Sequence, residues 1–232
     1  MPAVSDGDAP AGLFIVLYVS YSFGNRHRQR EAAMAHQALI VIDMQNDFCP
    51  GGALAVGGGD EIVPLVNHLI DSHDHVILTQ DWHPAGHSSF ASQHEGKQPF
   101  ETIDASYGPQ TLWPDHCVQG TKGAQFHDDL QWTKAELVIR KGFRPEIDSY
   151  SAFFENDHDT PTGLSGYLKE REFREVVLCG LATDFCVGFS ALDAVTCGFK
   201  TSVVMQACRA IDLDGSLAAM TERMRAAGVH LL

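Results

Sequence analysis

The chain has 232 residues, 44% of them hydrophobic, which suits one domain with a full-sized core. Its 16 lysines and arginines stand against 30 aspartates and glutamates, which gives a net charge of −14. This charge opposes general binding to phosphate backbones or anionic lipid, so neither nucleic acid nor a membrane is an expected partner.

Residues 1–37 are predicted to form an N-terminal extension that precedes the folded domain. Residues 25–30 are basic and unpatterned, and nothing upstream of Met34 carries candidate chemistry. The longest apolar run, residues 13–19, falls far short of the ~20 residues that span a bilayer, and a signal peptide would place its basic segment before such a run. We expect a poorly ordered tail or a start codon assigned too early, with one domain over residues 38–232.

Short β-branched, apolar runs predict buried parallel strands. They cover residues 38–42, 75–80, 136–140 and 176–180. Residues that can carry chemistry follow these runs, namely Asp43, Asp81, Lys141 and, after a short turn, Cys186. Ligands of open α/β sheets bind outside the carboxyl ends of the strands, so we expect these side chains to converge on one rim.

Helical patterns alternate with the strands. They cover residues 60–72, 162–173, 183–198 and 215–227, and further strands are expected at 201–205 and 229–232. The alternation predicts an α/β fold with three layers, in which a mostly parallel sheet carries helices on both faces. Residues 82–127 show no sustained period, and so long a loop is typical of a segment that builds a site.

Cys186 is the strongest candidate nucleophile because it follows a predicted strand-to-helix turn. With Thr183 as the N-cap, Cys186 falls near the third helical position, beside unpaired backbone N–H groups. We expect this position to lower the pKa of the thiol and to hold a developing oxyanion. The alternative is an inert, buried cysteine, which is what we expect of Cys179, Cys197 and Cys208.

Lys141 and Asp43 are candidate partners of the thiol. An ammonium beside a thiolate stabilises it, and a carboxylate can take the thiol proton and later protonate a leaving amine. As alternatives, Lys141 is a strand-end charge that reaches solvent and Asp43 is a turn or cap residue.

Asp81 and His83 stand two residues apart, and His87 and His116 follow in the long loop. A carboxylate with imidazoles suits Zn²⁺, Fe²⁺ or Mn²⁺, and three protein ligands leave open positions for water or substrate. A single Asp-x-His pair is weak evidence in a chain with 12 histidines. Cys117 is not favoured as a ligand, since thiolate sites usually show paired cysteines.

Together, five segments resemble a known family. They are LIVIDMQNDFCPGGALAV (39–56), TQDWHPAGHSSFAS (79–92), LWPDHCVQGTKGAQFH (112–127), VIRKGFRPEIDSYSAF (138–153) and CGLATDFCV (179–187). The chain resembles the bacterial nicotinamidases, also called pyrazinamidases, of the isochorismatase-like hydrolase superfamily. The match runs in order from about residue 38 to the end, and residues 1–37 have no counterpart in it.

The resemblance implies roles for individual residues. The catalytic triad of the family falls on Asp43, Lys141 and Cys186, and its metal ligands fall on Asp81, His83 and His116. His87 matches a histidine that binds the metal in some members and lies in an outer position in others. The oxyanion amides match Ala182 and Cys186, the Leu181–Ala182 bond would be a cis peptide, and the aromatic residues around the substrate ring match Phe48, Trp113 and Tyr150, with Trp82 adjacent.

The activity implied is hydrolysis of nicotinamide to nicotinate and ammonia in NAD salvage, with pyrazinamide as a further substrate. It would proceed through a cysteine thioester, with one divalent metal ion orienting the pyridine ring; zinc is the first choice, and iron or manganese are alternatives. Competing functions are an isochorismatase, a carbamoyl-amide hydrolase and a non-catalytic binder. Unpaired cysteines favour the cytoplasm, and the oligomeric state, including a homo-oligomer, stays open.

Overall fold

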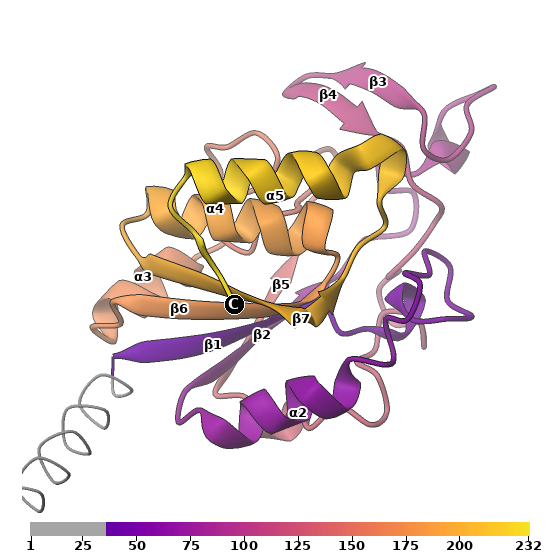
Figure 1. Cartoon of the computed structure of the whole chain (residues 1–232). Coiled ribbons are helices and arrows are strands. Elements are labelled where there is room, and N and C mark those ends of the chain that lie inside the picture. Colours follow the sequence, from indigo (N-terminus) through magenta and orange to yellow (C-terminus); the bar gives the residue numbers. More distant parts are fainter. Residues whose placement is uncertain (1–35) are drawn as a thin grey trace, which may run out of the picture. The chain divides into compact units, whose positions relative to one another are not determined.

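A six-stranded parallel sheet organises the computed structural model, which describes residues 36–232. The strand order is β5-β2-β1-β6-β7-β8, and every neighbouring pair is parallel. In Figure 1, α2 lies on one face of the sheet and α4 and α5 lie on the other. The predicted three-layer α/β fold is therefore confirmed. Met34 and the rest of the predicted extension up to residue 35 lie outside the described residues, so the division at residue 38 stays a prediction.

The elements follow in the predicted alternation. The strands are β1 (Gln37–Ile42), β2 (Val76–Asp81), β3 (Thr102–Ala105), β4 (Gly108–Thr111), β5 (Leu137–Lys141), β6 (Glu175–Leu181), β7 (Lys200–Arg209) and β8 (His230–Leu231). The helices are α2 (Val63–Ser72), α3 (Leu164–Glu170), α4 (Gly188–Thr196) and α5 (Ser216–Ala226). Among these described helices, none is long and apolar enough to cross a membrane.

The central strands are apolar on both faces because helices cover both faces of the sheet. In β1, residues Ala38 to Ile42 are fully buried, and every residue of β2 is buried. The prediction of a buried strand fails for β5, which lies at the edge of the sheet and exposes 38% of Val138. An edge strand has a neighbour on one side only, so part of it faces water.

Three predicted elements begin or end at residues other than those expected. Helix α2 begins at Val63 rather than at residue 60, with Pro64 in its first turn, where a missing N–H costs little. Helix α3 is shorter than predicted because Gly163, at a φ of 100°, precedes it and Glu172, at a φ of 60°, follows it. Strand β7 runs on to Arg209 across an irregularity in its pairing with β6.

The long segment 82–127 contains an antiparallel hairpin, β3–β4, that the sequence analysis missed. Each of its strands has four residues, and β3 buries no side chain completely. Such short, half-exposed strands leave almost no alternation of apolar and polar residues to detect. The hairpin carries Gln110, which contributes to the site described next.

Candidate active site

Lys141 is the centre of a buried cluster at the carboxyl ends of β1, β2, β5 and β6. Its Nζ lies 2.8 Å from Asp43 Oδ2, 3.1 Å from Asp81 Oδ1 and 3.4 Å from Cys186 Sγ. Nζ also donates to the Ser149 carbonyl at 3.0 Å. Lys141 is only 1% exposed, so it does not reach solvent from the strand end. The structure thus brings together the four side chains that the strand ends were expected to place on one rim.

Asp43 has one oxygen engaged and one oxygen available. Oδ1 accepts a hydrogen bond of 2.6 Å from the Thr79 hydroxyl, which itself accepts from the Asp43 amide at 3.1 Å. Oδ2 forms the ion pair with Lys141 but receives no aligned hydrogen bond. Burial raises the pKa of Asp43, and the Lys141 ammonium opposes that rise. A fully buried carboxylate with a raised pKa and an unengaged oxygen is suited to accept a proton.

The pKa of Cys186 is raised well above its usual value, which contradicts the expected lowering. Burial is the main cause, and the Asp43 and Asp81 carboxylates add to it, while Lys141 opposes. The expected lowering of the pKa rested on the position of Cys186 at the start of a helix and did not include burial or these two buried anions. The thiol is therefore neutral at rest, and it requires a base. Asp43, which pairs with the same Lys141 ammonium that contacts the thiol, is placed to be that base.

The turn that carries Cys186 is a π-helical turn, Thr183–Val187, which leads into α4. Thr183 is not its N-cap, because Thr183 already lies inside the turn and Ala182, with extended backbone, precedes it. The amides of Phe185 and Val187 both donate to the Ala182 carbonyl at 3.1 Å. The predicted single α-helix over residues 183–198 is wrong in its first turn, where a π-helical turn often marks a functional site.

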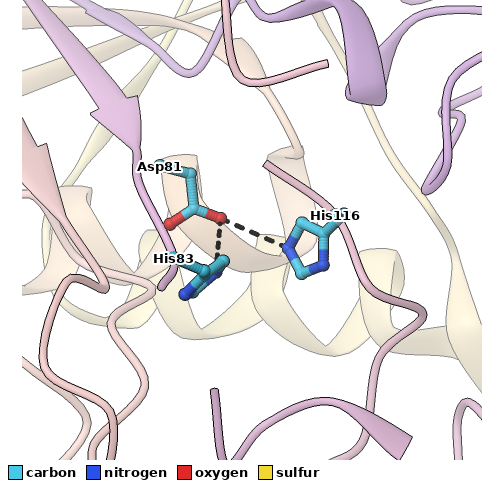
Figure 2. Close-up of side chains that lie close together, drawn as sticks. All are labelled: Asp81, His83 and His116. Atoms are coloured by element: carbon cyan, nitrogen blue, oxygen red, sulfur yellow. Dashed lines mark hydrogen bonds and ion pairs between the residues drawn. The ribbon is translucent and has the colours of Figure 1, made fainter. Parts of the chain in front are cut away.

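Figure 2 shows Asp81, His83 and His116 converging. Asp81 Oδ2 lies 3.0 Å from His83 Nε2 and 3.3 Å from His116 Nε2, and all three side chains are buried. Each imidazole has its Nδ1 2.8 Å from a backbone carbonyl, Gly142 for His83 and Pro114 for His116. A carbonyl only accepts, so Nδ1 of each ring carries a proton, and Nε2 faces Asp81 either with a second proton or with a lone pair.

The Asp81 carboxylate needs a positive charge beside it, which imidazole protons or a metal ion can supply. One carboxylate and two imidazoles are a suitable ligand set for a divalent transition metal, and the two carbonyl contacts fix the orientation of the imidazole rings. Burial would raise the pKa of Asp81, yet His83 and Lys141 hold it well below its usual value. Burial would likewise lower the pKa of His83, but Asp81 raises it. The residues fit a metal.

His87 lies outside this cluster. Its Nδ1 contacts Ser89 Oγ at 2.8 Å and its Nε2 contacts the Ile147 carbonyl at 3.2 Å. It groups instead with His83 and Asp148.

Cys117 is also not gathered with the metal-type ligands. Burial raises the pKa of its thiol well above the usual value, and its Sγ accepts from Gln45 Nε2 at 3.4 Å.

A small cavity opens beside Cys186. It is lined by Phe48, Leu54, Asp81, Trp113, His116, Asp148, Ser149, Tyr150, Ala182, Phe185, Cys186 and Ile211. The predicted aromatic residues Phe48, Trp113 and Tyr150 are thus among the lining residues. Trp82 does not line the cavity, since its ring packs 3.9 Å from the Arg140 guanidinium instead.

Comparison with known proteins agrees with this geometry. An Isochorismatase domain model matches residues 37–232. The chain belongs to the isochorismatase family. It is 56% identical over 193 residues to a nicotinamidase of Acinetobacter baylyi, covering 83% of this chain and 90% of the relative.

Solved structures of relatives superpose on this isochorismatase-family chain. A nicotinamidase and pyrazinamidase of Acinetobacter baumanii is 56% identical, with a TM-score of 0.85, over 85% of this chain and 96% of that one. The pyrazinamidase of Pyrococcus horikoshii in complex with zinc is 35% identical, with a TM-score of 0.68, over 85% of this chain and 98% of that one.

Two features of this isochorismatase-family site were missed from the sequence. Phe185 lines the cavity with its ring edge-on to Trp113, at 4.9 Å, and to Tyr150, at 5.5 Å. Asp184 accepts hydrogen bonds from the amides of Ile211 at 3.0 Å and Asp212 at 2.7 Å, which holds Ile211 against the cavity. Asp184 and Phe185 directly precede Cys186 in the sequence, and this position was the only sign that they contribute to the site. The Leu181–Ala182 peptide is cis, as the resemblance implied.

Proposed function

We propose that this chain hydrolyses nicotinamide to nicotinate and ammonia, with Cys186 as the nucleophile. The observation that carries the proposal is the contact of the Cys186 thiol with Lys141, which is itself paired with Asp43, beside an aromatic cavity. The 56% identity to a nicotinamidase supports the choice of substrate. The metal-type cluster of Asp81, His83 and His116 borders the same cavity and supports it further.

The first half of the reaction forms a thioester. Asp43 Oδ2 takes the thiol proton, and the Cys186 sulfur attacks the carboxamide carbon. The carbon–nitrogen bond then breaks, and Asp43 returns the proton to the departing nitrogen, which leaves as ammonia. Lys141 supports this step because its ammonium offsets the negative charge on Asp43 and on the transient thiolate. The amides of Ala182 and Cys186 are the candidate donors to the oxyanion.

The second half of the reaction releases the acid. Water gives a proton to Asp43 and its oxygen attacks the thioester carbon. The carbon–sulfur bond breaks, and the proton passes from Asp43 back to the Cys186 sulfur. The freed carboxylic acid gives its remaining proton to solvent and becomes nicotinate. Each proton that Asp43 takes is returned, so the residues end the cycle as they began.

Asp81, His83 and His116 would hold one divalent metal ion. When bound, the metal supplies a Lewis-acidic position that orients the ring nitrogen of the substrate. Zinc is the first choice because the Pyrococcus horikoshii relative was solved with zinc, and the ligand set also accepts iron or manganese. His87 is proposed as an outer residue, since both of its nitrogens contact other groups.

Phe48, Trp113 and Tyr150 are proposed to enclose the pyridine ring, and Phe185 joins them. Trp113 and Tyr150 meet edge-on, with ring centres 6.1 Å apart, and the Trp113 indole N–H donates to the Tyr150 hydroxyl at 3.2 Å. Pyrazinamide has a ring of the same size and would fit the same enclosure. The net charge of −14 and the free thiols of all six cysteines support a small-molecule partner and a reducing cytoplasmic location.

The test is ammonia release from nicotinamide by the zinc-loaded protein, with C186A and a chelator-treated sample alongside. We expect release by the wild type, none by C186A, and loss after chelation that added zinc restores. Release by C186A would contradict the role of Cys186. No release by the wild type would contradict the proposed substrate.

A further inference from the structure

Asp148 is a buried carboxylate at the cavity that the mechanism above does not use. It lies in the loop between β5 and α3, is 2% exposed and lines the cavity. Its Oδ1 accepts from the Ser149 amide at 2.8 Å and its Oδ2 from Gln110 Nε2 at 2.7 Å. A buried carboxylate usually has a cationic partner, yet no lysine or arginine among the described residues forms an ion pair with it. Its nearest candidate partners are instead the His83 and His87 imidazoles, whose ring nitrogens lie within 4.8 Å of it.

Gln110 fixes this carboxylate in place. The Tyr107 hydroxyl donates to Gln110 Oε1 at 3.1 Å, and Asn156 Nδ2 donates to the same oxygen at 3.2 Å. Gln110 Nε2 also contacts the Tyr150 hydroxyl at 3.1 Å. Because the network joins the hairpin to the aromatic wall, Asp148 cannot turn its charge away from the cavity.

The field of Asp148 reaches the cavity wall. Burial, assisted by Asp148, raises the pKa of Tyr150 well above its usual value. The same two causes raise the pKa of Tyr107 to about 12. Both effects disfavour a second negative charge in this region.

The charges around the cavity match a neutral ligand. Asp43, Asp81 and Asp148 contribute three carboxylates, and Lys141 contributes one ammonium. A divalent metal on Asp81 would bring the total to zero, whereas the same site without Asp148 would be left positive. Nicotinamide is neutral and nicotinate is an anion, so the reaction creates a charge inside this site.

We propose that Asp148 is a specificity-determining residue that lets the site favour the neutral carboxamide over the anionic acid product. The inference rests on the proposed function. Asp148 repels the carboxylate of nicotinate and leaves nicotinamide unaffected by direct charge. The product is thus released by electrostatic repulsion from a buried side chain, and the reacting groups need not move.

The test measures binding in the absence of turnover. In zinc-loaded C186A, calorimetry gives the Kd of nicotinamide and the Kd of nicotinate. Adding D148N is expected to lower the ratio of the nicotinate Kd to the nicotinamide Kd about tenfold, which corresponds to about 1.4 kcal/mol. The matched control is D157N, which also removes a carboxylate that accepts from nearby amides but that does not line the cavity. It should leave the ratio unchanged.

Two results would overturn the role of Asp148. One is a ratio in D148N within twofold of that in D157N. The other is loss of bound zinc in D148N alone, since Asp148 would then act through the proposed metal ligands. If D148N does not fold, D148S carries the same test. Failure of wild-type ammonia release would instead contradict the proposed function, so the two failures are distinct.

Discussion

Gly142 directly follows Lys141, and replacing it with alanine should displace the proposed metal ligands His83 and Asp81. Gly142 has a φ of 66°, and a Cβ there would lie 2.5 Å from His83 Cε1, 2.8 Å from His83 Nδ1 and 3.0 Å from Asp81 Oδ1. Carbon atoms pack at about 3.5–4.0 Å, so the imidazole must move by roughly 1 Å. His83 is fully buried and has no room to move freely. The Gly142 carbonyl that accepts from His83 Nδ1 would shift as well.

We expect G142A to bind zinc about 10–100-fold more weakly, as is typical of changes to groups that hold a metal-binding side chain in place. It should also lose about 1–2 kcal/mol of stability, because alanine is strained in a left-handed backbone. Competition with a chromogenic chelator measures the affinity, and urea unfolding of the metal-free protein measures the stability. The matched control is G228A, since Gly228 has a φ of 85° and no atom within 4 Å of an added Cβ. G228A should lose similar stability and keep its zinc affinity. Equal zinc affinity in the two variants would refute the reasoning.

Other substitutions test the buried polar groups and the apolar core. K141M should lower the free energy of unfolding by about 3–5 kcal/mol at neutral pH, because Asp43 and Asp81 would stay buried without their cation. The double variant D43N/K141M should recover part of this loss. Urea unfolding that shows no recovery would contradict the pairing. Q45A should lower the free energy of unfolding by about 3 kcal/mol, because Gln45 donates to the Asp81 carbonyl at 2.8 Å and accepts from the Asp81 amide at 2.7 Å. An unchanged thermal midpoint of unfolding would exclude this role. L78A, at a fully buried position of β2, should lower the free energy of unfolding in urea by about 2–5 kcal/mol. A loss below 1 kcal/mol would show that this part of the core is loosely packed.

The sequence predicted the rim of the sheet well because that rim depends on local pattern. The runs before Asp43, Asp81 and Lys141 are continuous and apolar, and such runs become central or neighbouring parallel strands whose ends lie together. The partners Asp81 and Lys141 are paired residues in the ladder between β2 and β5. Their contact follows from strand register alone.

Features that depend on tertiary packing could not be predicted in this way. The direction of the pKa shift of Cys186 depends first on the burial of the thiol, to which two carboxylates from other strands add. Trp82 follows its strand directly, but its ring packs against Arg140 and away from the cavity. The role of Gln110 depends on a hairpin whose short strands leave little pattern, and on hydrogen bonds to residues far away in the sequence.

The identity of the group that carries the acyl intermediate tests the central claim most directly. Zinc-loaded protein is mixed with nicotinamide, quenched in acid during the first turnover, digested and analysed by peptide mass spectrometry. The account predicts a nicotinoyl thioester on the peptide that contains Cys186, and none in C186A. A nicotinoyl group on another side chain, or steady ammonia release by C186A, would contradict it.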